Sequence, residues 1–152
     1  MSLGTLDKLF AKDQDKSRKG VELDVGFNEK DEPIIMVVAD INHPDAEKIR
    51  RKYEKAFENS RHFPKKRQLV WARFLAESVL RDWKGVLDSD GNELKCTHER
   101  KVEALTAHED LFSMILRFAD DRDNFRPDEN FDEIGSDNLP PEEDSEKNSQ
   151  TA

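Results

Sequence analysis

The feature that most constrains this chain is the uninterrupted apolar periodicity between Lys65 and Trp83. Apolar residues recur there at alternating spacings of three and four, the pattern of one face of an α-helix. No proline or glycine occurs inside the stretch, and Gly85 just after it is a typical helix stop. The pattern predicts the longest helix of the protein. The residues of that stretch expected in the core are Leu69, Ala72, Leu75, Ala76, Val79 and Trp83.

Two apolar segments that precede this helix predict a β-hairpin. In residues 21–27, apolar side chains alternate with polar residues and a glycine, as in a strand with one buried face. Residues 34–39 are apolar on both sides, and the polar segment Asn28–Pro33 has the composition of a turn. An isolated two-stranded hairpin is only marginally stable. We therefore expect one face to pack on the helices and the other face or edge to meet another subunit.

Three shorter helices are expected around the long one. The first starts at Asn42-His43-Pro44-Asp45, where residues typical of a helix start cluster, and runs to about Asn59. Thr97 is a typical N-cap for the second, and the last is expected from about Glu109 to Asp121. The fold class is therefore mainly α with a small N-terminal β-hairpin (α+β). The core residues expected from the last helix include Leu111, Phe112 and Ile115.

Charge divides the chain into a body and a tail. The 152 residues carry a formal net charge of −9, and residues 127–152 hold nine Asp or Glu but one Lys, which is −8 of that total. Such a composition does not bury enough apolar surface to fold. We expect a flexible N-terminal segment or short docking helix over residues 1–19, a compact folded domain over 20–126, and a disordered acidic tail over 127–152.

Cysteine content and hydropathy bear on the compartment. Cys96 is the single cysteine, so no intrachain disulfide is possible, and a reducing cytosol is the default. No apolar run reaches the length of a membrane-spanning helix, and the first 20 residues lack the apolar segment of a signal peptide. We expect a cytoplasmic protein with no membrane partner.

The sequence contains no recognisable catalytic or metal-binding motif. Its four histidines and one cysteine have no zinc-site spacing, and no phosphate-binding glycine loop or nucleophile motif occurs. The acidic segment 88–93 fails the calcium-loop test: with Gly91 as the loop glycine, the first position is Val86 and the twelfth is Thr97. We interpret Asp90-Gly91 as a β-turn. No enzymatic activity, cofactor or metal is expected.

Residues 48–67 form a basic stretch, with nine Lys or Arg against Glu54 and Glu58, a net charge of +7. Such a stretch is usually the solvated face of helices. The alternatives are an anionic partner, nucleic acid or the chain's own acidic tail. The net negative charge of the chain and the lack of interleaved aromatic residues argue against nucleic acid.

Several segments together carry a likeness to a known family. They are the hairpin from Val21 to Asp40, the helix from Asn42 to Tyr53, and LRDWKGVLDSDGN at residues 80–92, which leads through Thr97 into a short helix. The closing segments 110–116 and 121–125 belong to the same likeness. On these segments the chain resembles the tail assembly chaperones of long-tailed (siphovirus-type) bacteriophages. The basic stretch 48–67 departs from that family's pattern.

The resemblance implies a non-enzymatic phage protein that acts in the cytoplasm of the infected cell. Chaperones of this family coat the helix-rich tape measure protein, keep it soluble and help tail tube subunits assemble around it. They are usually absent from the finished virion, and in many such phages a ribosomal frameshift adds a second domain to part of the product. The acidic tail would lie where that junction occurs.

A chaperone for amphipathic helices needs apolar grooves and no catalytic groups. The candidate contacts are surplus apolar residues, for which ordinary core packing and self-association are the alternatives. Two other functions stay open: an acidic regulatory or anti-defence phage protein that binds a nucleic-acid-related or basic host partner, and a structural tail component retained in the virion. The candidate partner-binding residues are Leu6, Leu9, Phe10, Ile35 and Val37.

Overall fold

The computed structural model describes residues 3–127, which belong to two compact units. One unit comprises Met1–Asp13 together with Arg126–Ala152, and the other is Gln14–Phe125. In the first unit, α1 (Thr5–Leu9) is a five-residue helix that buries no side chain. The expected disordered tail lies outside the described residues except for Pro127.

The Gln14–Phe125 unit begins six residues before the expected boundary at residue 20, because it includes α2 (Gln14–Lys19). Ser17 of this helix is fully buried, and its hydroxyl donates to Asp40 Oδ2 at 3.0 Å. The backbone N–H of Asp40 in turn donates to the Ser17 carbonyl at 2.9 Å. These two bonds attach α2 to the chain just after the second strand.

Three antiparallel strands form the sheet, in the order β1 (Val21–Phe27), β2 (Pro33–Val38) and β3 (Leu80–Lys84). The hairpin β1–β2 is as predicted, and β2 is the central strand of the sheet. Leu23, Met36 and Trp83 lie opposite one another on the face that packs on the core. The fold class, mainly α with a small antiparallel sheet, is confirmed.

The third strand corrects the predicted long helix. That helix, α4 (Pro64–Ser78), ends at Ser78 instead of continuing to Trp83. The register shifts between Val37 and Val38, which lie opposite Asp82 and Leu80, so that Arg81 is left in a bulge. Leu80 and Trp83 are consequently both buried although they are three residues apart. A spacing of three inside a bulged strand looks helical in the sequence.

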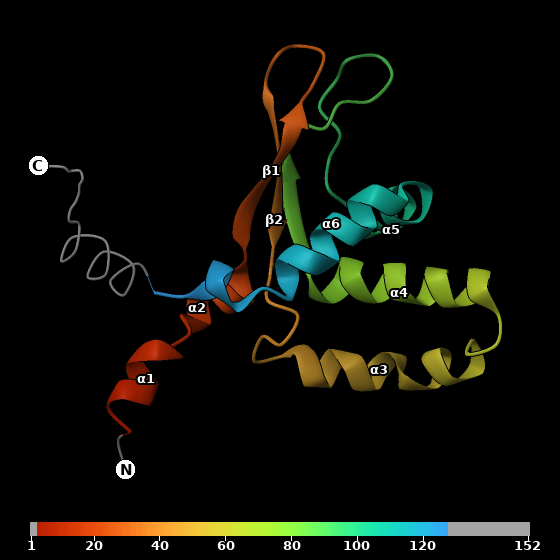
Figure 1. Cartoon of the computed structure of the whole chain (residues 1–152). Helices are drawn as coiled ribbons and strands as arrows, with labels where there is room; N and C mark the ends of the chain where they lie inside the picture. The colour runs from red at the N-terminus through yellow and green to blue at the C-terminus, as the bar shows by residue number, and fades with distance from the viewer. Residues whose placement is uncertain (1–2, 128–152) are drawn as a thin grey trace, which may run out of the picture. The chain divides into compact units, whose positions relative to one another are not determined.

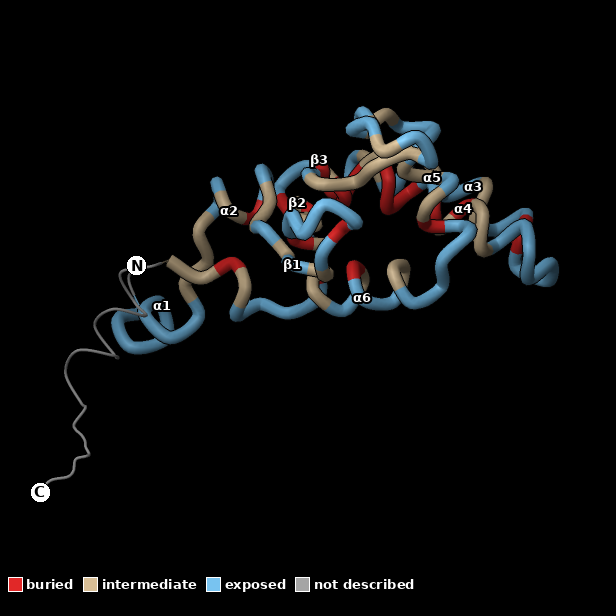
Figure 2. Tube along the Cα trace, turned by 90° about the horizontal axis from the view of Figure 1, so that it is seen from above, coloured by how far each residue is buried: buried red, intermediate tan, exposed pale blue. Residues whose placement is uncertain are grey.

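Helices α4, α5 (His98–Ala107) and α6 (Glu109–Ala119) lie on one side of the sheet (Figure 1). α4 is the central element of the core, since it packs on α3 (Ala46–Asn59), on α5 and on β3. Figure 2 shows buried residues gathered where the sheet meets the helices. A short 3-10 helix, η1 (Arg122–Phe125), closes the unit and buries Phe125.

Most of the expected core residues are buried. Ala72, Leu75, Ala76, Val79, Trp83 and Ile115 belong to the core cluster. Leu111 and Phe112 are half-buried and pack against the cluster, whereas Leu69 is half-buried and does not contribute to it.

The ends of the shorter helices are set by local hydrogen bonds. Thr97 caps α5 as predicted: its side-chain oxygen accepts from the backbone N–H of Arg100 at 3.2 Å. α3 begins at Ala46, later than the predicted start near Pro44, because the His43 ring accepts the backbone N–H of Asp45 at 3.1 Å. The carbonyl of His43 also accepts the N–H of Ala46, which keeps residues 43–45 in a turn.

α3 and α4 are joined by aromatic packing. Tyr53, Phe57, Trp71 and Phe74 make four edge-to-face contacts with ring centroids 5.1–6.0 Å apart. The Tyr53 hydroxyl donates to Glu77 at 2.7 Å. Burial and this bond raise the pKa of Tyr53 to about 12. The two helices therefore form a rigid helical hairpin.

Within residues 3–127, no helix is both long and apolar enough to cross a lipid bilayer.

Candidate functional site: an apolar cleft between two loops and two helices

Two loops lie side by side at one end of the sheet, the hairpin turn 28–32 and the segment 85–93 (Figure 1). The side chain of Asn28 holds both of them. Its Oδ1 accepts the backbone N–H groups of Lys30 at 2.9 Å and Glu32 at 3.1 Å, and its Nδ2 donates to the Gly85 carbonyl at 2.8 Å. One nearly buried amide thus shapes the turn and fixes its distance from the second loop.

Gly85 is required where the chain leaves β3. Its φ is +79°, and an added Cβ would lie 2.3 Å from the carbonyl oxygen of Pro33. That distance is far below van der Waals contact, and the opposing atom belongs to the backbone of β2 and cannot move aside. Glycine therefore allows the second loop to cross closely over the start of β2.

The loop that follows has the turn predicted from Asp90 and Gly91. One carboxylate oxygen of Asp88 accepts the backbone N–H groups of Asp90 and Asn92, each at 2.9 Å. Gly91 supplies the left-handed conformation with φ +84°. Among residues 3–127, no group of three or more His, Cys, Asp or Glu side chains is arranged to hold a metal ion.

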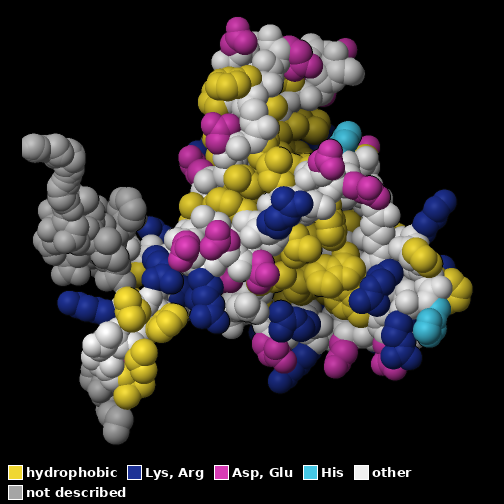
Figure 3. Space-filling view, viewed as in Figure 1, with side chains coloured by type: hydrophobic (Ala, Val, Ile, Leu, Met, Phe, Trp, Pro, Cys, Tyr) yellow, Lys and Arg dark blue, Asp and Glu magenta, His cyan; other side chains and the backbone are white. Residues whose placement is uncertain are grey.

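Between these loops and helices α5 and α6 is a cleft of about 430 Å³. Trp83 lies at its wall, with the indole N–H donating to the Leu94 carbonyl at 2.8 Å. Figure 3 shows hydrophobic side chains gathered beneath the two loops. The charged or titratable residues of the lining are Glu29, Arg100, Glu103 and His108. The apolar lining consists of Val25, Ile34, Met36, Trp83, Val86, Leu87, Leu94, Ala104 and Leu111.

α6 adds apolar surface beside the cleft. Its sequence EDLFSMILRFA is the most hydrophobic of the helices in the described unit, yet Ile115 and Ala119 are the two residues of α6 that are buried. Leu111, Phe112, Leu116 and Phe118 are half-buried, and Met114 is 40% exposed. The helix therefore keeps apolar area that the fold itself does not cover.

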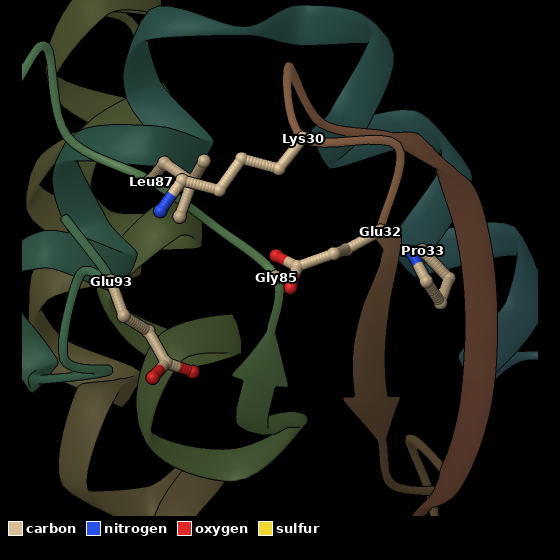
Figure 4. Close-up of a pocket in the computed structure, with 6 residues that line it drawn as sticks. All are labelled: Lys30, Glu32, Pro33, Gly85, Leu87 and Glu93. Atoms are coloured by element: carbon tan, nitrogen blue, oxygen red, sulfur yellow. The ribbon is translucent and has the colours of Figure 1, made fainter. Parts of the chain in front are cut away.

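A second, polar groove of about 300 Å³ lies between the same two loops (Figure 4). Lys30 and Glu32 enter it from the hairpin turn, and Glu93 enters it from the second loop. These three side chains form no ion pair within residues 3–127. Two carboxylates and one lysine form no recognisable catalytic or metal-binding arrangement here. The apolar cleft is therefore the stronger candidate for binding.

A buried polar pair, His43 and Ser78, superficially suggests a nucleophile and its base. His43 Nε2 lies 3.0 Å from Ser78 Oγ, and both residues are nearly inaccessible to solvent. However, Nδ1 accepts the N–H of Asp45, so in the neutral ring the proton is on Nε2 and is donated to Ser78. Burial first, and the nearby Arg81 second, lower the pKa of His43 and keep it neutral. A ring that donates to the hydroxyl cannot accept its proton, so this bond connects structural elements.

The predicted partner-binding residues lie elsewhere. Leu6, Leu9 and Phe10 are 50–60% exposed in the unit that contains α1. Ile35 and Val37 are half-buried on the face of the sheet opposite the core, between acidic and basic residues of β1 and β3. On that face, Lys84 Nζ of β3 and Glu22 Oε2 of β1 form an ion pair at 2.8 Å across the central strand. None of the five lines the cleft.

The cleft instead uses residues that the sequence assigned to core or turn. Trp83 and Leu111 were expected in the core, and both line the cleft. Asn28 and Gly85 were not recognised as site residues. The available signal was the apolar pair Val86-Leu87 next to the exposed turn 88–93, where a simple turn needs no apolar side chains.

Most of the Gln14–Phe125 unit matches a known protein family. A family model described as YdaY prophage protein matches residues 41–136, which span α3 to η1 and include the second loop of the cleft. The match covers more than half of the chain, so the chain belongs to the YdaY prophage protein family and is phage-derived. No curated protein and no solved structure matches it.

Proposed function

We propose that this protein is a tail assembly chaperone that receives an amphipathic helix of the phage tape measure protein in its apolar cleft. The observation that carries the proposal is the cleft of about 430 Å³, lined by apolar residues from three strands, two helices and a loop. Membership of a prophage family supports the phage setting, and the resemblance described above supplies the partner.

The geometry supports binding of helical side chains. In helix-in-groove recognition, apolar residues spaced by three or four anchor in a hydrophobic groove, and polar residues at the rim orient the helix. The cleft combines an apolar lining with Arg100, Glu103 and His108 from α5 and its end. The half-buried surface of α6 extends the apolar area. Each 100 Å² of apolar surface covered by a partner contributes about 2.5 kcal/mol, from which the entropic cost of association is subtracted.

This role requires no catalytic group, cofactor or metal. It accounts for an apolar surface that would otherwise favour aggregation, because a chaperone keeps such a surface free until the partner is synthesised. In this proposal the protein acts in the host cytoplasm, with several copies along one long partner and the tail tube subunits as later partners. It leaves before the virion is complete.

The proposal is tested by co-expressing the protein with the tape measure protein of its own genome and measuring light scattering of the purified material. The expected result is a stable complex with several copies per partner that survives moderate salt, because apolar burial is not screened. Leu87→Asp, which places a charge in the cleft, should abolish the complex. Phe27→Asp, at an exposed apolar position of β1 outside the cleft lining, is the matched control and should retain it.

Two results would contradict the proposal. One is a tape measure protein that aggregates while the chaperone candidate elutes alone. The other is a complex that Leu87→Asp and Phe27→Asp leave equally intact although both variants keep the helical circular dichroism of the parent, because the partner would then bind elsewhere.

A further inference from the structure

The end of the helical hairpin α3–α4 carries a cluster of cations around an exposed aromatic ring. We define the basic tip as Lys55 near the end of α3, Arg61 and Phe63 in the connection, and Lys65, Lys66 and Arg67 at the start of α4. All six side chains are exposed. Figure 3 shows Lys and Arg side chains over this end of the two helices.

The cations of the basic tip differ from those nearer the start of α3. Arg50 and Arg51 both contact Glu47, and Lys52 contacts Glu77 at 2.8 Å. By contrast, within residues 3–127 no carboxylate lies in ion-pair distance of any of the five cations of the tip. The cations of the tip therefore form no ion pair within the described structure, and residues 55–67, with Glu58 included, carry a formal net charge of +4.

The placement of these cations does not serve helix stability. The positive end of a helix dipole is at its N-terminus, where acidic residues stabilise and basic residues destabilise by about 0.3–1 kcal/mol each. The first turn of α4 contains no acidic residue, and no side chain caps it. Three successive cations, Lys65, Lys66 and Arg67, thus lie where the helix itself favours an anion.

Phe63 adds a feature that a purely solvating surface lacks. Phe63 is 54% exposed. A connection that only joins two helices could have a polar residue at such a position. Lys66 Nζ lies over the ring, 5.0 Å from its centroid, so a cation and an exposed aromatic ring are adjacent. An aromatic face beside several cations is the arrangement by which proteins bind unstacked bases and the phosphates that connect them.

We infer that the basic tip binds single-stranded nucleic acid, with the cations on successive phosphates and one base on Phe63. The net charge of −9 argued against this at the level of the sequence. In the structure the cations are segregated at one end of a helical hairpin. Charges farther away than about 10 Å are largely screened at 0.1 M salt, so the local charge decides. An acidic protein segment would match the charge but would gain nothing specific from the exposed ring.

The inference is independent of the proposed chaperone role, because the basic tip shares no residue with the cleft. It is tested by fluorescence anisotropy of a labelled oligothymidylate over a salt series. The variant Lys65→Glu/Lys66→Glu/Arg67→Glu removes three phosphate contacts. It should weaken binding by more than tenfold and lower the slope of log K against log salt by about 2. Phe63→Ala should weaken binding by roughly 5- to 150-fold with an unchanged slope.

The matched control is Lys19→Glu/Lys95→Glu/Arg117→Glu. It changes the net charge equally at three scattered exposed positions, and it should retain the affinity within about threefold. Equal losses in both triple variants would overturn the inference, because binding would then follow total charge alone. Competition by polyglutamate as effective as that of unlabelled oligothymidylate would also overturn it, in favour of an acidic protein partner. Circular dichroism verifies folding, and Lys65→Gln/Lys66→Gln/Arg67→Gln replaces the first variant if that variant does not fold.

Discussion

At the scale of single residues, the Asn28 side chain and the absence of a side chain at Gly85 shape the site, and a buried histidine sets the start of α3. Asn28 joins the two loops through bonds to Lys30, Glu32 and Gly85. Gly85 allows the close crossing over β2 because it has no Cβ. His43, neutral and buried, bonds Ser78 and the backbone of Asp45, and so determines where α3 begins. Each of these effects is local and can be tested by substitution.

Gly85→Ala should be strongly destabilising. The added methyl group would meet the Pro33 carbonyl at 2.3 Å in a left-handed conformation, so β2 and the second loop must separate. We expect a loss of about 3 kcal/mol or more in the free energy of unfolding, measured by urea denaturation. Gly91→Ala is the control. Its φ is also positive, but nothing lies within 4 Å of the added Cβ, and it should cost about 1–2 kcal/mol.

Stability should fall on acidification through the titration of His43. Burial lowers the pKa of this ring in the folded state, so the unfolded chain binds a proton first as the pH falls below about 6.5. The contribution is present above the unfolded pKa and is lost as the pH falls through the folded pKa. His43→Gln should show a smaller drop in urea midpoint between pH 7.5 and pH 5.5 than the parent. His62→Gln, at an exposed position, should match the parent; equal drops in all three proteins would contradict the assignment.

At the scale of elements, the segment after α4 shows how tertiary context overrides a periodic pattern. Residues 69–83 satisfy a helical period, yet the chain changes from helix to strand at Val79. Within residues 3–127, β3 covers the edge of the central strand β2 that β1 does not pair with, and it gives the backbone groups there their partners. The bulge at Arg81 then keeps Leu80 and Trp83 in the core, so no burial is lost by the change.

Hydrogen exchange monitored by NMR distinguishes the strand from the predicted helix. In an antiparallel edge strand, alternate N–H groups point away from the neighbouring strand, and the N–H of Trp83 bonds the side chain of Asp82. We expect alternating fast and slow exchange along Leu80–Lys84, with continuous protection in the interior of α4. Uniformly slow exchange from Leu75 to Trp83 would contradict the strand.

At the scale of the whole molecule, the Gln14–Phe125 unit carries two surfaces of opposite character. The cleft is apolar and is formed by the sheet, the second loop, α5 and α6. The basic tip is formed by the far end of the α3–α4 hairpin, which the aromatic contacts of Tyr53, Phe57, Trp71 and Phe74 hold rigid. No residue belongs to both surfaces. This separation allows each to bind without the other.

The two surfaces should therefore respond independently. Leu87→Asp should remove tape measure binding and leave oligothymidylate binding unchanged, and the triple Glu variant of the tip should do the reverse. In the combined variant, the two losses in binding free energy should equal those of the single variants within about 0.5 kcal/mol, because distant sites without shared partners are additive. Salt titration adds a second criterion: high salt should abolish nucleic-acid binding and spare tape measure binding.

The sequence by itself determined the elements whose signals are local. The alternation of residues 21–27, the turn at Asp90-Gly91, the Thr97 cap and the last helix all depend on neighbours within a few residues, and the structure has each of them. Most of the core was identified for the same reason, since an apolar stripe is buried whichever element carries it.

The tertiary structure decided what depends on contacts distant in sequence. β3 exists because β2 needs a partner, and Asn28 and Gly85 matter because residues 57 positions apart meet. The cleft has walls from three strands, two helices and the loops between them, so no single periodicity predicts it. The same is true of charge. The sequence contains the cations of residues 48–67, but the fold decides which of them pair with carboxylates and which are left exposed at the tip. Pairing depends on distance in space, which the sequence does not give.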